Sequence, residues 1–527
     1  MPLEASRETR HFIEAPMVAG WSSVSQNEPE SKDGRTDQSI SGDRCAVGIP
    51  EKLRGSHVPN LVNWGGGCVK PRVCIIGAGS CGLVALKAMR DAGLDCQAFE
   101  MSDQVGGLWV FGNSNGRGGA YRSLRINTSA ATMQLSGLPW PAGTPDFPHH
   151  TEVARYLHSY ATKFGLLPHI QFRTQVRLCS PRAGGGYDVT IEDSATGERK
   201  TTFFAAVVVA NGHHWLPSFP DPFPPSKFEG PILHSHQYID PDQPVNLRDK
   251  RVLVVGMGNS AADIASELAL WGGAQRVLLS ARRGAWVLPK KVLGKPVDQG
   301  HFFPTWLPAK LRRRLVTRAF VSLYGTMKDC GLPEPDHLIG EAHPTLSDEL
   351  PRLVQAGRVV MRPALRQLTE CAASFEDGSN DEIDAVIFST GYHVSFPFFS
   401  AEHITAPNNR LSLFRRIFHP EHRHVFFVGL AQPLGAILPI AALQAEWIAE
   451  HLAGRYSLPD LEQMRADVAR EEGAIANRYT PSPRHTMQID PTSYARQTKR
   501  ERRCGQKRAA RGEGLRFCVP AQPKVEA

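Results

Sequence analysis

The sequence lacks the cysteine patterns of a disulfide-bonded or zinc-binding protein. Its ten cysteines include no C-x-x-C pair and no other metal-ligand spacing, so neither a disulfide framework nor a metal site is expected. Reduced thiols indicate a cytoplasmic protein. At roughly 150 residues per domain, the 527 residues are enough for two or three domains with full cores.

The sequence also lacks a secretory signal and a long apolar run. No basic start followed by an apolar core is found in the first 20 residues, which excludes a signal peptide. The most apolar stretch, 425–449, is interrupted by two prolines, two glutamines and a glutamate. Because a membrane span would not tolerate these residues, we expect the stretch to lie inside a globular domain and we expect no membrane anchor.

The sequence has a small excess of positive charge, since 60 Lys and Arg against 52 Asp and Glu give a net charge of +8. Residues 496–511 hold eight Lys or Arg and one Glu, a net of +7, which leaves +1 for the other 511 residues. We interpret this segment as a solvated, disordered tail rather than a contact for nucleic acid or membrane. No nucleic-acid partner is therefore expected, and removal of the tail should leave activity intact.

Two stretches follow the strand, glycine turn, helix, strand order of a βαβ unit. In the first, VCIIGAG leads into helical spacing and then into DCQAFE; in the second, RVLVVGMG leads into a helix and then RVLLSARR. A later apolar strand, VFFVGL, indicates that the chain returns to the first unit. The sequence predicts an α/β fold with two Rossmann-like dinucleotide-binding domains, the NADP domain inserted in the FAD domain.

This organisation divides the chain into five expected segments. The stretch 284–357, rich in Lys, Arg and Pro, is left without an assignment inside the third of them. The segments are a flexible leader (1–70), the first part of the FAD-binding domain (71–228), the NADP-binding domain with an inserted segment (229–392), the second part of the FAD-binding domain (393–460) and a C-terminal extension with the basic tail (461–527).

The first unit carries the G-x-G-x-x-G fingerprint of a dinucleotide site. Its glycines allow a tight turn, approach of the backbone to a pyrophosphate, and packing of helix on strand. The glycines alone would arise by chance about 0.4 times in such a chain, but Glu100 ends the next strand, where a carboxylate binds ribose hydroxyls. The candidate residues are Gly77, Ala78, Gly79, Ser80, Cys81, Gly82, Glu100, Gly107, Leu108 and Trp109.

Cys81 and the stretch 106–109 each have two possible roles. Cys81 would start the helix, where a thiol pKa can fall, although a small residue packed beside the cofactor is the favoured interpretation. The stretch 106–109 either brings backbone and an aromatic ring to a ligand or serves packing alone.

The second unit repeats the fingerprint with alanine in third place. Where the first unit has Glu100, this one has Arg282 and Arg283, whose guanidinium groups would pair with a 2′-phosphate that glutamate would repel. The sequence therefore predicts FAD at the first site and NADPH at the second. The candidate residues are Gly256, Gly258, Asn259, Ser260, Ala261, Arg282 and Arg283.

Between the two units, FEGPILHSHQY resembles the F-x-G-x-x-x-H-x-x-x-[Y/F] fingerprint of flavin-containing monooxygenases. By composition such a match is expected about 0.005 times by chance. The likeness extends over about 71–455. Its matching residues are Phe228, Gly230, His234 and Tyr238 in the fingerprint, Leu108 and Trp109, the run Asn127-Thr128-Ser129, and Thr390-Gly391-Tyr392.

The resemblance implies a flavin-containing monooxygenase that uses NADPH and FAD to transfer one oxygen atom from O2, through a C4a-hydroperoxyflavin, to a nucleophilic N or S of a small molecule. Asn127 matches the active-site asparagine of the family, whose amide would hydrogen-bond NADP and the peroxide, and Thr128, Thr390 and Gly391 carry over as cofactor contacts. The fingerprint would couple the two domains rather than act in catalysis. A homo-oligomer is possible, and the C-terminal anchor of vertebrate members does not carry over.

Other functions stay open at this point. A Baeyer–Villiger monooxygenase acting on ketones is disfavoured by Tyr238, where such enzymes usually have Trp. A disulfide reductase needs a redox cysteine pair, which is not found after Glu100. The remaining alternatives are an NADPH-dependent flavin reductase or oxidase without oxygen transfer, and a non-enzymatic flavoprotein that binds partners through its basic tail.

Overall fold

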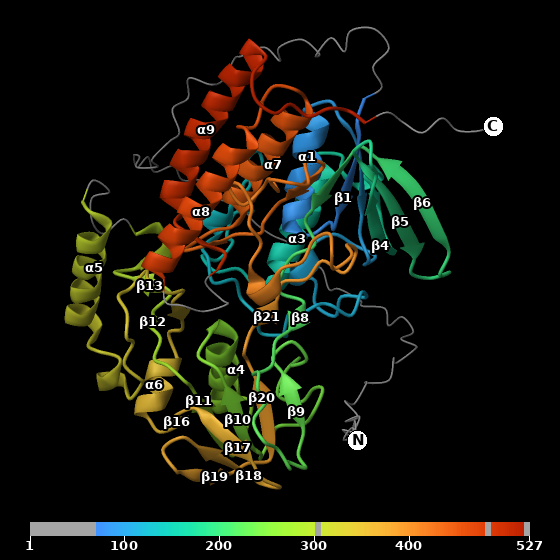
Figure 1. Ribbon diagram of the computed structural model, residues 1–527. Coiled ribbons are helices and arrows are strands. Elements are labelled where there is room, and N and C mark those ends of the chain that lie inside the picture. The colour runs from blue at the N-terminus through green and yellow to red at the C-terminus, as the bar shows by residue number, and fades with distance from the viewer. Residues whose placement is uncertain (1–69, 301–306, 480–485, 521–527) are drawn as a thin grey trace, which may run out of the picture. The chain divides into compact units, whose positions relative to one another are not determined.

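Two five-stranded parallel sheets form the framework of the protein (Figure 1). The structure is a computed structural model that describes residues 70–300, 307–479 and 486–520, all within one compact unit of the chain, Leu61–Ala527. The leader expected at 1–70 lies outside the described residues, apart from Lys70.

The first sheet holds the first βαβ unit. Its central strands are continuous apolar runs and are buried on both faces, as in parallel sheets covered by helices. Helix α1 (Ser80–Asp91) packs against α7 (Leu438–Leu452) on this sheet, and α3 (His150–Lys163) joins the same core. In spatial order the strands are β22 (Val425–Phe427), β7 (Ala206–Val209), β1 (Arg72–Ile76), β2 (Asp95–Phe99) and β3 (Ile170–Gln171).

The second sheet holds the second βαβ unit. Helix α4 (Asn259–Leu270) connects its two central strands and packs with α6 (Leu350–Gln355) in a separate core. In spatial order the strands are β16 (Val359–Arg362), β11 (Arg276–Ser280), β10 (Arg251–Val255), β20 (Ala385–Phe388) and β9 (Ile232–His234).

The second sheet is inserted in the first. All of its strands lie in the sequence between β7 and β22, which are neighbours in the first sheet. The two connections between the sheets pair with each other as antiparallel strands, β8 (Leu216–Pro217) and β21 (Tyr392–His393). The predicted fold, with one Rossmann-like domain inserted in another, is confirmed.

Each parallel sheet has a small antiparallel sheet beside it. The strands are β4 (Thr174–Pro181), β5 (Tyr187–Asp193) and β6 (Arg199–Phe204) near the first sheet, and β17 (Leu365–Leu368), β18 (Ala372–Phe375) and β19 (Asn380–Glu382) near the second.

The stretch 284–357, which the sequence left unassigned, follows the second βαβ unit. It pairs with itself in two short strand pairs and carries a helix with a basic surface. Its elements are β12 (Val287–Leu288), β13 (Lys291–Val292), β14 (Lys295–Pro296), the 3-10 helix η4 (Val297–Gln299), α5 (Ala309–Tyr324), β15 (Thr345–Leu346) and α6.

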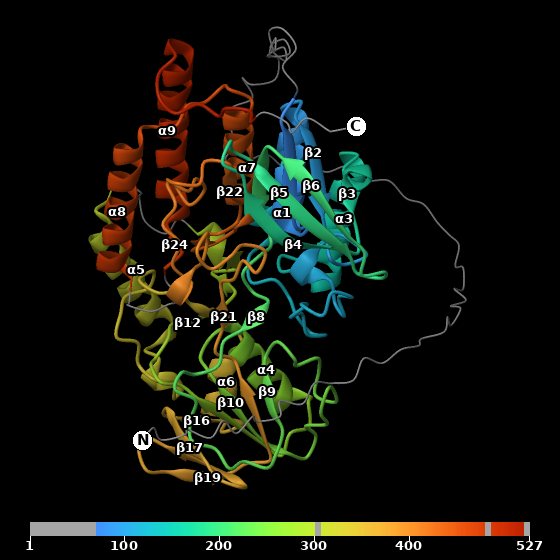
Figure 2. The same ribbon diagram turned by 45° about the vertical axis from the view of Figure 1, so that its right-hand side comes forward.

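The basic segment 496–511 is not the disordered tail that its charge predicted. It belongs to helix α9 (Pro491–Arg511), which follows α8 (Leu461–Arg478) and strand β24 (Gln488–Ile489) and lies beside α7 in both views (Figures 1 and 2). The expectation was wrong because the arginines and lysines alternate with residues that face the protein. The buried residues of α9 are Tyr494, Thr498 and Gly505.

Candidate active site

Two positions where the chain passes from β1 into α1 have room for glycine only. Gly77 has a φ of +99°, and a Cβ there would lie 2.7 Å from the carbonyl oxygen of Ala210. A Cβ at Gly82 would lie 1.9 Å from the carbonyl oxygen of Gly77. These two positions therefore meet the demands of a tight turn and of close packing of helix on strand.

Gly79, the middle glycine of this turn, faces the backbone of Gly107. A Cβ at Gly107 would lie 3.0 Å from the Cα of Gly79. Gly107 opens the 3-10 helix η2 (Gly107–Trp109), and Leu108 and Trp109 line the same cavity as the turn. The structure thus brings two segments of bare backbone together at the edge of the first sheet.

Glu100 holds the first turn in place. The side chain is 6% exposed, and its Oε2 accepts a hydrogen bond from the backbone nitrogen of Ala78 over 2.7 Å. Its Oε1 accepts from the backbone nitrogen and from the Oγ of Ser102, both over 3.0 Å. Because a carboxylate has about four acceptor positions, one position remains for a ribose hydroxyl.

The turn between β10 and α4 repeats this construction. Gly256 has a φ of +135°, and a Cβ there would lie 2.5 Å from the carbonyl oxygen of Ser389. Ala261, the third position, is fully buried. The Oδ1 of Asn259 accepts a hydrogen bond from the backbone nitrogen of Leu346 over 2.8 Å, so this side chain ties the turn to the stretch 284–357. The residues of this turn that line the cavity are Gly256, Met257, Gly258, Asn259 and Ser260.

Arg282 and Arg283 follow the last residue of β11 by two and three positions. Both are exposed and both line the cavity. Arg276, at the other end of the strand, is instead held in an ion pair with Asp381 over 3.0 Å. The pair at the carboxyl end of β11 is therefore placed where a nucleotide on the second turn would carry its ribose.

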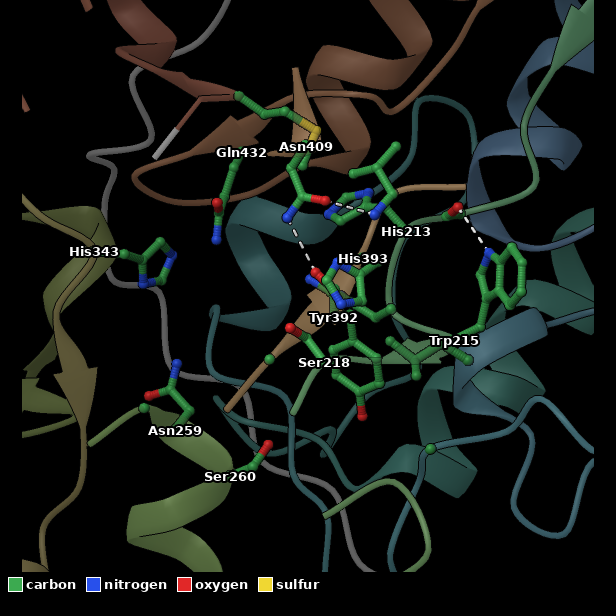
Figure 3. Close-up of a pocket in the computed structure, with 18 of the residues that line it drawn as sticks. His213, Trp215, Ser218, Asn259, Ser260, His343, Tyr392, His393, Asn409 and Gln432 are labelled. Atoms are coloured by element: carbon green, nitrogen blue, oxygen red, sulfur yellow. Dashed lines mark hydrogen bonds between the residues drawn. The ribbon is translucent and has the colours of Figure 1, made fainter. Parts of the chain in front are cut away.

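Both turns open into one cavity of about 1790 Å³. Ser80, Cys81, Thr128, Thr390 and Gly391 line it as well (Figure 3 shows part of its wall). Three predicted residues do not line it, since their roles lie in the backbone or in packing: Ala78, Gly82 and Ala261.

Asn127 also lines this cavity. Its Oδ1 is buried and has no hydrogen-bond partner among the described residues. Because a buried acceptor without a partner costs free energy, this atom fits a position that a bound group would complete.

Comparison with known proteins agrees with this arrangement. Residues 70–501 match the family model described as flavin-binding monooxygenase-like. Flavin-containing monooxygenase 5 of Oryctolagus cuniculus is 37% identical over 442 residues, which cover 80% of each chain. This chain belongs to the flavin-binding monooxygenase family. The resemblance seen in the fingerprint is thereby confirmed, and the protein is an enzyme of the flavin-containing monooxygenase kind.

Solved structures show the same fold as this monooxygenase. The S-allyl-L-cysteine S-oxygenase from Allium sativum is similar with a TM-score of 0.62 at 24% identity, covering 84% of this chain and 93% of the other. An oxidized steroid monooxygenase bound to NADP is similar with a TM-score of 0.61 at 18% identity, covering 82% and 98%.

FAD and NADPH are the cofactors of this family, and the residues of the monooxygenase fit them. In each glycine turn the first position has no room for a Cβ, since one at Gly77 or Gly256 would lie 2.7 or 2.5 Å from a backbone carbonyl oxygen, and tight turns of this kind let backbone approach a pyrophosphate. The buried and unpartnered Oδ1 of Asn127 lies in the same cavity. FAD at the first turn and NADPH at the second is the assignment that the acidic and basic strand ends favour.

The family fingerprint is structural in this monooxygenase. Tyr238 is 1% exposed, and its hydroxyl donates to the Oε2 of Glu267 on α4 over 3.0 Å. Burial raises the pKa of this hydroxyl far above its usual range, so it keeps its proton. His234 is fully buried at the end of β9, and a Cβ at Gly230 would collide with the ring of Phe228. These contacts pack the fingerprint within the second domain, and its coupling of the two domains stays a prediction.

The geometry of Cys81 favours packing over reactivity. A Cβ at Gly429 would lie 2.3 Å from the Sγ of Cys81, so the thiol fills the space beside that backbone. Burial raises the pKa of Cys81 to about 11, which keeps it a neutral thiol despite its position at the start of α1.

Sequence reasoning missed the histidines and the tryptophan after β7. His213 and Trp215 line the cavity, and the guanidinium of Arg117 lies 4.3 Å from the centre of the Trp215 ring. Burial lowers the pKa of His213 to about 4, so its imidazole is neutral at pH 7. Their place just past the carboxyl end of a central parallel strand was a signal that could have identified them.

Asn409 was also missed. Its Oδ1 accepts from the backbone nitrogen of Val394 over 2.7 Å, and its Nδ2 donates to the carbonyl oxygen of Tyr392 over 3.1 Å (dashed in Figure 3). These bonds fix the chain where it leaves the second domain. No local pattern pointed to this residue, because its partners lie 15 and 17 positions before it in the sequence.

Within the described ranges, no group of three or more His, Cys, Asp or Glu is placed to hold a metal ion. In the same part of the chain, no helix has both the length and the apolar character needed to cross a membrane.

Proposed function

We propose that this monooxygenase uses NADPH and FAD to transfer one oxygen atom of O2 to a nucleophilic nitrogen or sulfur of a small molecule. The observation that carries the proposal is that both nucleotide turns and the buried, unpartnered Oδ1 of Asn127 share one cavity. A nucleotide on each turn and an amide in the same cavity are the parts that such a reaction needs.

The two nucleotides would be held by different chemistry. Backbone at Gly79 and Gly107 would receive the FAD pyrophosphate, and the last acceptor position of Glu100 would receive a ribose hydroxyl. Arg282 and Arg283 would pair with the 2′-phosphate of NADPH. With both cofactors bound, NADPH would supply the reducing electrons and the flavin would activate O2.

Asn127 would orient the bound groups. Its Oδ1 accepts and its Nδ2 donates, so one side chain serves both kinds of polar atom. Hydrogen bonds are stronger where water is excluded, and this Oδ1 is out of contact with solvent. His213 is neutral at pH 7 because burial lowers its pKa to about 4, and it therefore does not supply a proton there as an imidazolium.

The test is a product screen of the purified, flavin-loaded enzyme with NADPH and air. The panel contains tertiary amines, sulfides and cyclic ketones, with S-allyl-L-cysteine included because it is named for the Allium structure. Products are identified by mass, and hydrogen peroxide is measured in parallel.

Each outcome decides between the functions. An N-oxide or a sulfoxide, heavier than its substrate by one oxygen atom, supports the proposal. Esters or lactones from ketones alone would replace it with a Baeyer–Villiger function. NADPH oxidation that yields only hydrogen peroxide with every compound would replace it with an oxidase.

A further inference from the structure

Asp298 reaches from the stretch 284–357 to the loop that carries Asn127. Its Oδ2 accepts hydrogen bonds from the backbone nitrogen of Ser129 over 2.8 Å, from the Oγ of Ser129 over 3.1 Å, and from the Oγ1 of Thr132. The Nε2 of Gln299 adds a fourth bond by donating to the Oγ of Ser129 over 3.0 Å. One carboxylate oxygen thus receives three donors that lie 166 to 169 positions away in the sequence.

The residue that Asp298 holds lies two positions from Asn127. Ser129 is fully buried, so its backbone nitrogen would have no water to replace the carboxylate. Asp298 and Asn127 both line the cavity, and each has a buried Oδ1 without a partner among the described residues. The contact is therefore at the point where the Asn127 loop enters the site.

The segment that leads to Asp298 is itself anchored by backbone hydrogen bonds. The backbone nitrogen of Val297 donates to the carbonyl oxygen of Lys290 over 3.0 Å, and that of Lys290 donates to the Oδ1 of Asp348 over 2.9 Å. Strand β12 pairs with β15. Leu346 in β15 donates a hydrogen bond to Asn259, so hydrogen bonds link this segment to the second nucleotide turn.

We propose that Asp298 is a positioning residue, which fixes the Asn127 loop and thereby places the Asn127 amide relative to the nucleotide on the second turn. Hydrogen bonds to a charged acceptor are about twice as strong as neutral ones, and three of them meet on one oxygen. The rate of a reaction such as oxygen transfer is sensitive to small displacements of the groups that orient the reactants. The consequence for catalysis rests on the proposed function, whereas the consequence for the loop does not.

A matched control is available in the same region. Lys291 and Asp146 form an ion pair over 2.7 Å between the same two parts of the chain. The backbone oxygen of Asp146 also accepts a hydrogen bond from the nitrogen of Ala130 over 2.8 Å, and a change of the Asp146 side chain keeps this bond. Asp146→Asn removes a carboxylate from this interface and leaves the bonds of Asp298 in place. Asp298→Ala removes all three bonds, whereas Asp298→Asn keeps an acceptor but loses its charge.

The first measurement is amide hydrogen exchange of the flavin-loaded enzyme, followed in peptides that cover 127–133. We expect exchange about tenfold faster in Asp298→Ala, the size of effect that loss of bonds to a charged acceptor produces. Asp298→Asn should be intermediate, and Asp146→Asn should match the wild type. Wild-type exchange in both Asp298 variants, or equal acceleration in Asp146→Asn, would overturn the proposal.

The second measurement is the fraction of consumed NADPH that appears as oxygenated product. We expect at least about a fivefold fall in Asp298→Ala, with hydrogen peroxide rising in compensation and with bound flavin unchanged. Wild-type coupling in this variant would reject the role in catalysis. If the wild type itself forms no oxygenated product, the proposed function fails, while the exchange experiment still decides whether Asp298 positions the loop.

Discussion

The backbone of Gly505 lies directly against the ring of Tyr456, so that a Cβ at Gly505 would come within 1.9 Å of the ring carbon Cε2. Tyr456 is fully buried and donates to the Oε1 of Glu501 over 3.1 Å. On the same helix, Arg502 pairs with Glu450 over 2.6 Å. The basic segment is therefore packed on the first domain through α7, and its removal is not expected to be harmless.

Gly505→Ala should lower the stability of the protein, because the new methyl group has no space beside Tyr456. Overpacking of this kind costs about 1–3 kcal/mol, and a melting temperature of the flavin-loaded enzyme measures it. Gly473→Ala is the control, since Gly473 lies in α8 with nothing within 4 Å of its Cβ position. That change should stabilise by up to about 1 kcal/mol, as alanine is the better helix former.

Removal of residues 491–527 tests the same contact on a larger scale. We expect a lower melting temperature and loss of bound flavin, because α9 packs against α7, which in turn packs against α1 beside the first nucleotide turn. A truncated enzyme with the stability and activity of the full chain would restore the interpretation of a dispensable tail.

Replacing Arg282 and Arg283 by alanine should raise the KM for NADPH by about tenfold or more, and should leave that for NADH nearly unchanged. The reason is that only NADPH carries the 2′-phosphate that the two guanidinium groups would bind. Steady-state kinetics with both coenzymes measures the change. Arg276→Ala, which removes an arginine from the other end of β11, should keep the wild-type preference. Equal effects on both coenzymes would exclude a phosphate contact.

Asn127→Ala should lower the rate of product formation by about tenfold or more, while the bound flavin is retained and NADPH oxidation continues with release of hydrogen peroxide. The expected cause is loss of the amide that orients the bound groups. Asn115→Ala is the control, since Asn115 also lines the cavity but accepts a hydrogen bond within its own loop, from the backbone nitrogen of Arg117 over 2.8 Å. An equal fall in the rate of product formation in both variants would indicate general disruption of the cavity rather than loss of a specific amide.

Acid should destabilise the protein between pH 6.5 and pH 4, in part through His451. This side chain is 2% exposed, and burial lowers its pKa to about 4, against about 6.5 in the unfolded chain. Its contribution is therefore complete above pH 6.5 and is lost as the pH falls through 4. Each such histidine adds a slope of about 1.4 kcal/mol per pH unit to the unfolding free energy.

Denaturant unfolding at a series of pH values measures this slope, and His451→Gln should make it shallower by one proton. The variant is expected to be less stable at pH 7.5, because the Nδ1 bond to the carbonyl oxygen of Tyr456 is altered. An unchanged slope would show that His451 does not titrate in this range. His403 and His419, whose pKa values are also lowered to about 4 by burial, should account for part of the remaining slope.

Much of the fold and part of the site could be predicted from local patterns. Gly77 follows strand β1 and Gly82 lies in the first turn of helix α1. Both elements have clear sequence patterns, so the conformational roles of the two glycines could be predicted from neighbouring residues. Glu100 was placed correctly at its strand end, but its bond to Ala78 depends on how β2 lies beside β1. Helix α9 was misjudged because net charge says nothing about which face of a helix is buried.

Two nucleotide-binding units, one inserted in the other, and the resemblance to the family could be recognised in the amino-acid sequence. These conclusions rest on residues close together in the chain, where the lack of a Cβ or the sign of a charge has a direct physical meaning. The bond of Asp298 to Ser129 and the packing of Gly505 on Tyr456 became visible in the folded protein. Such contacts join distant segments, and they depend on packing geometry that no short pattern records.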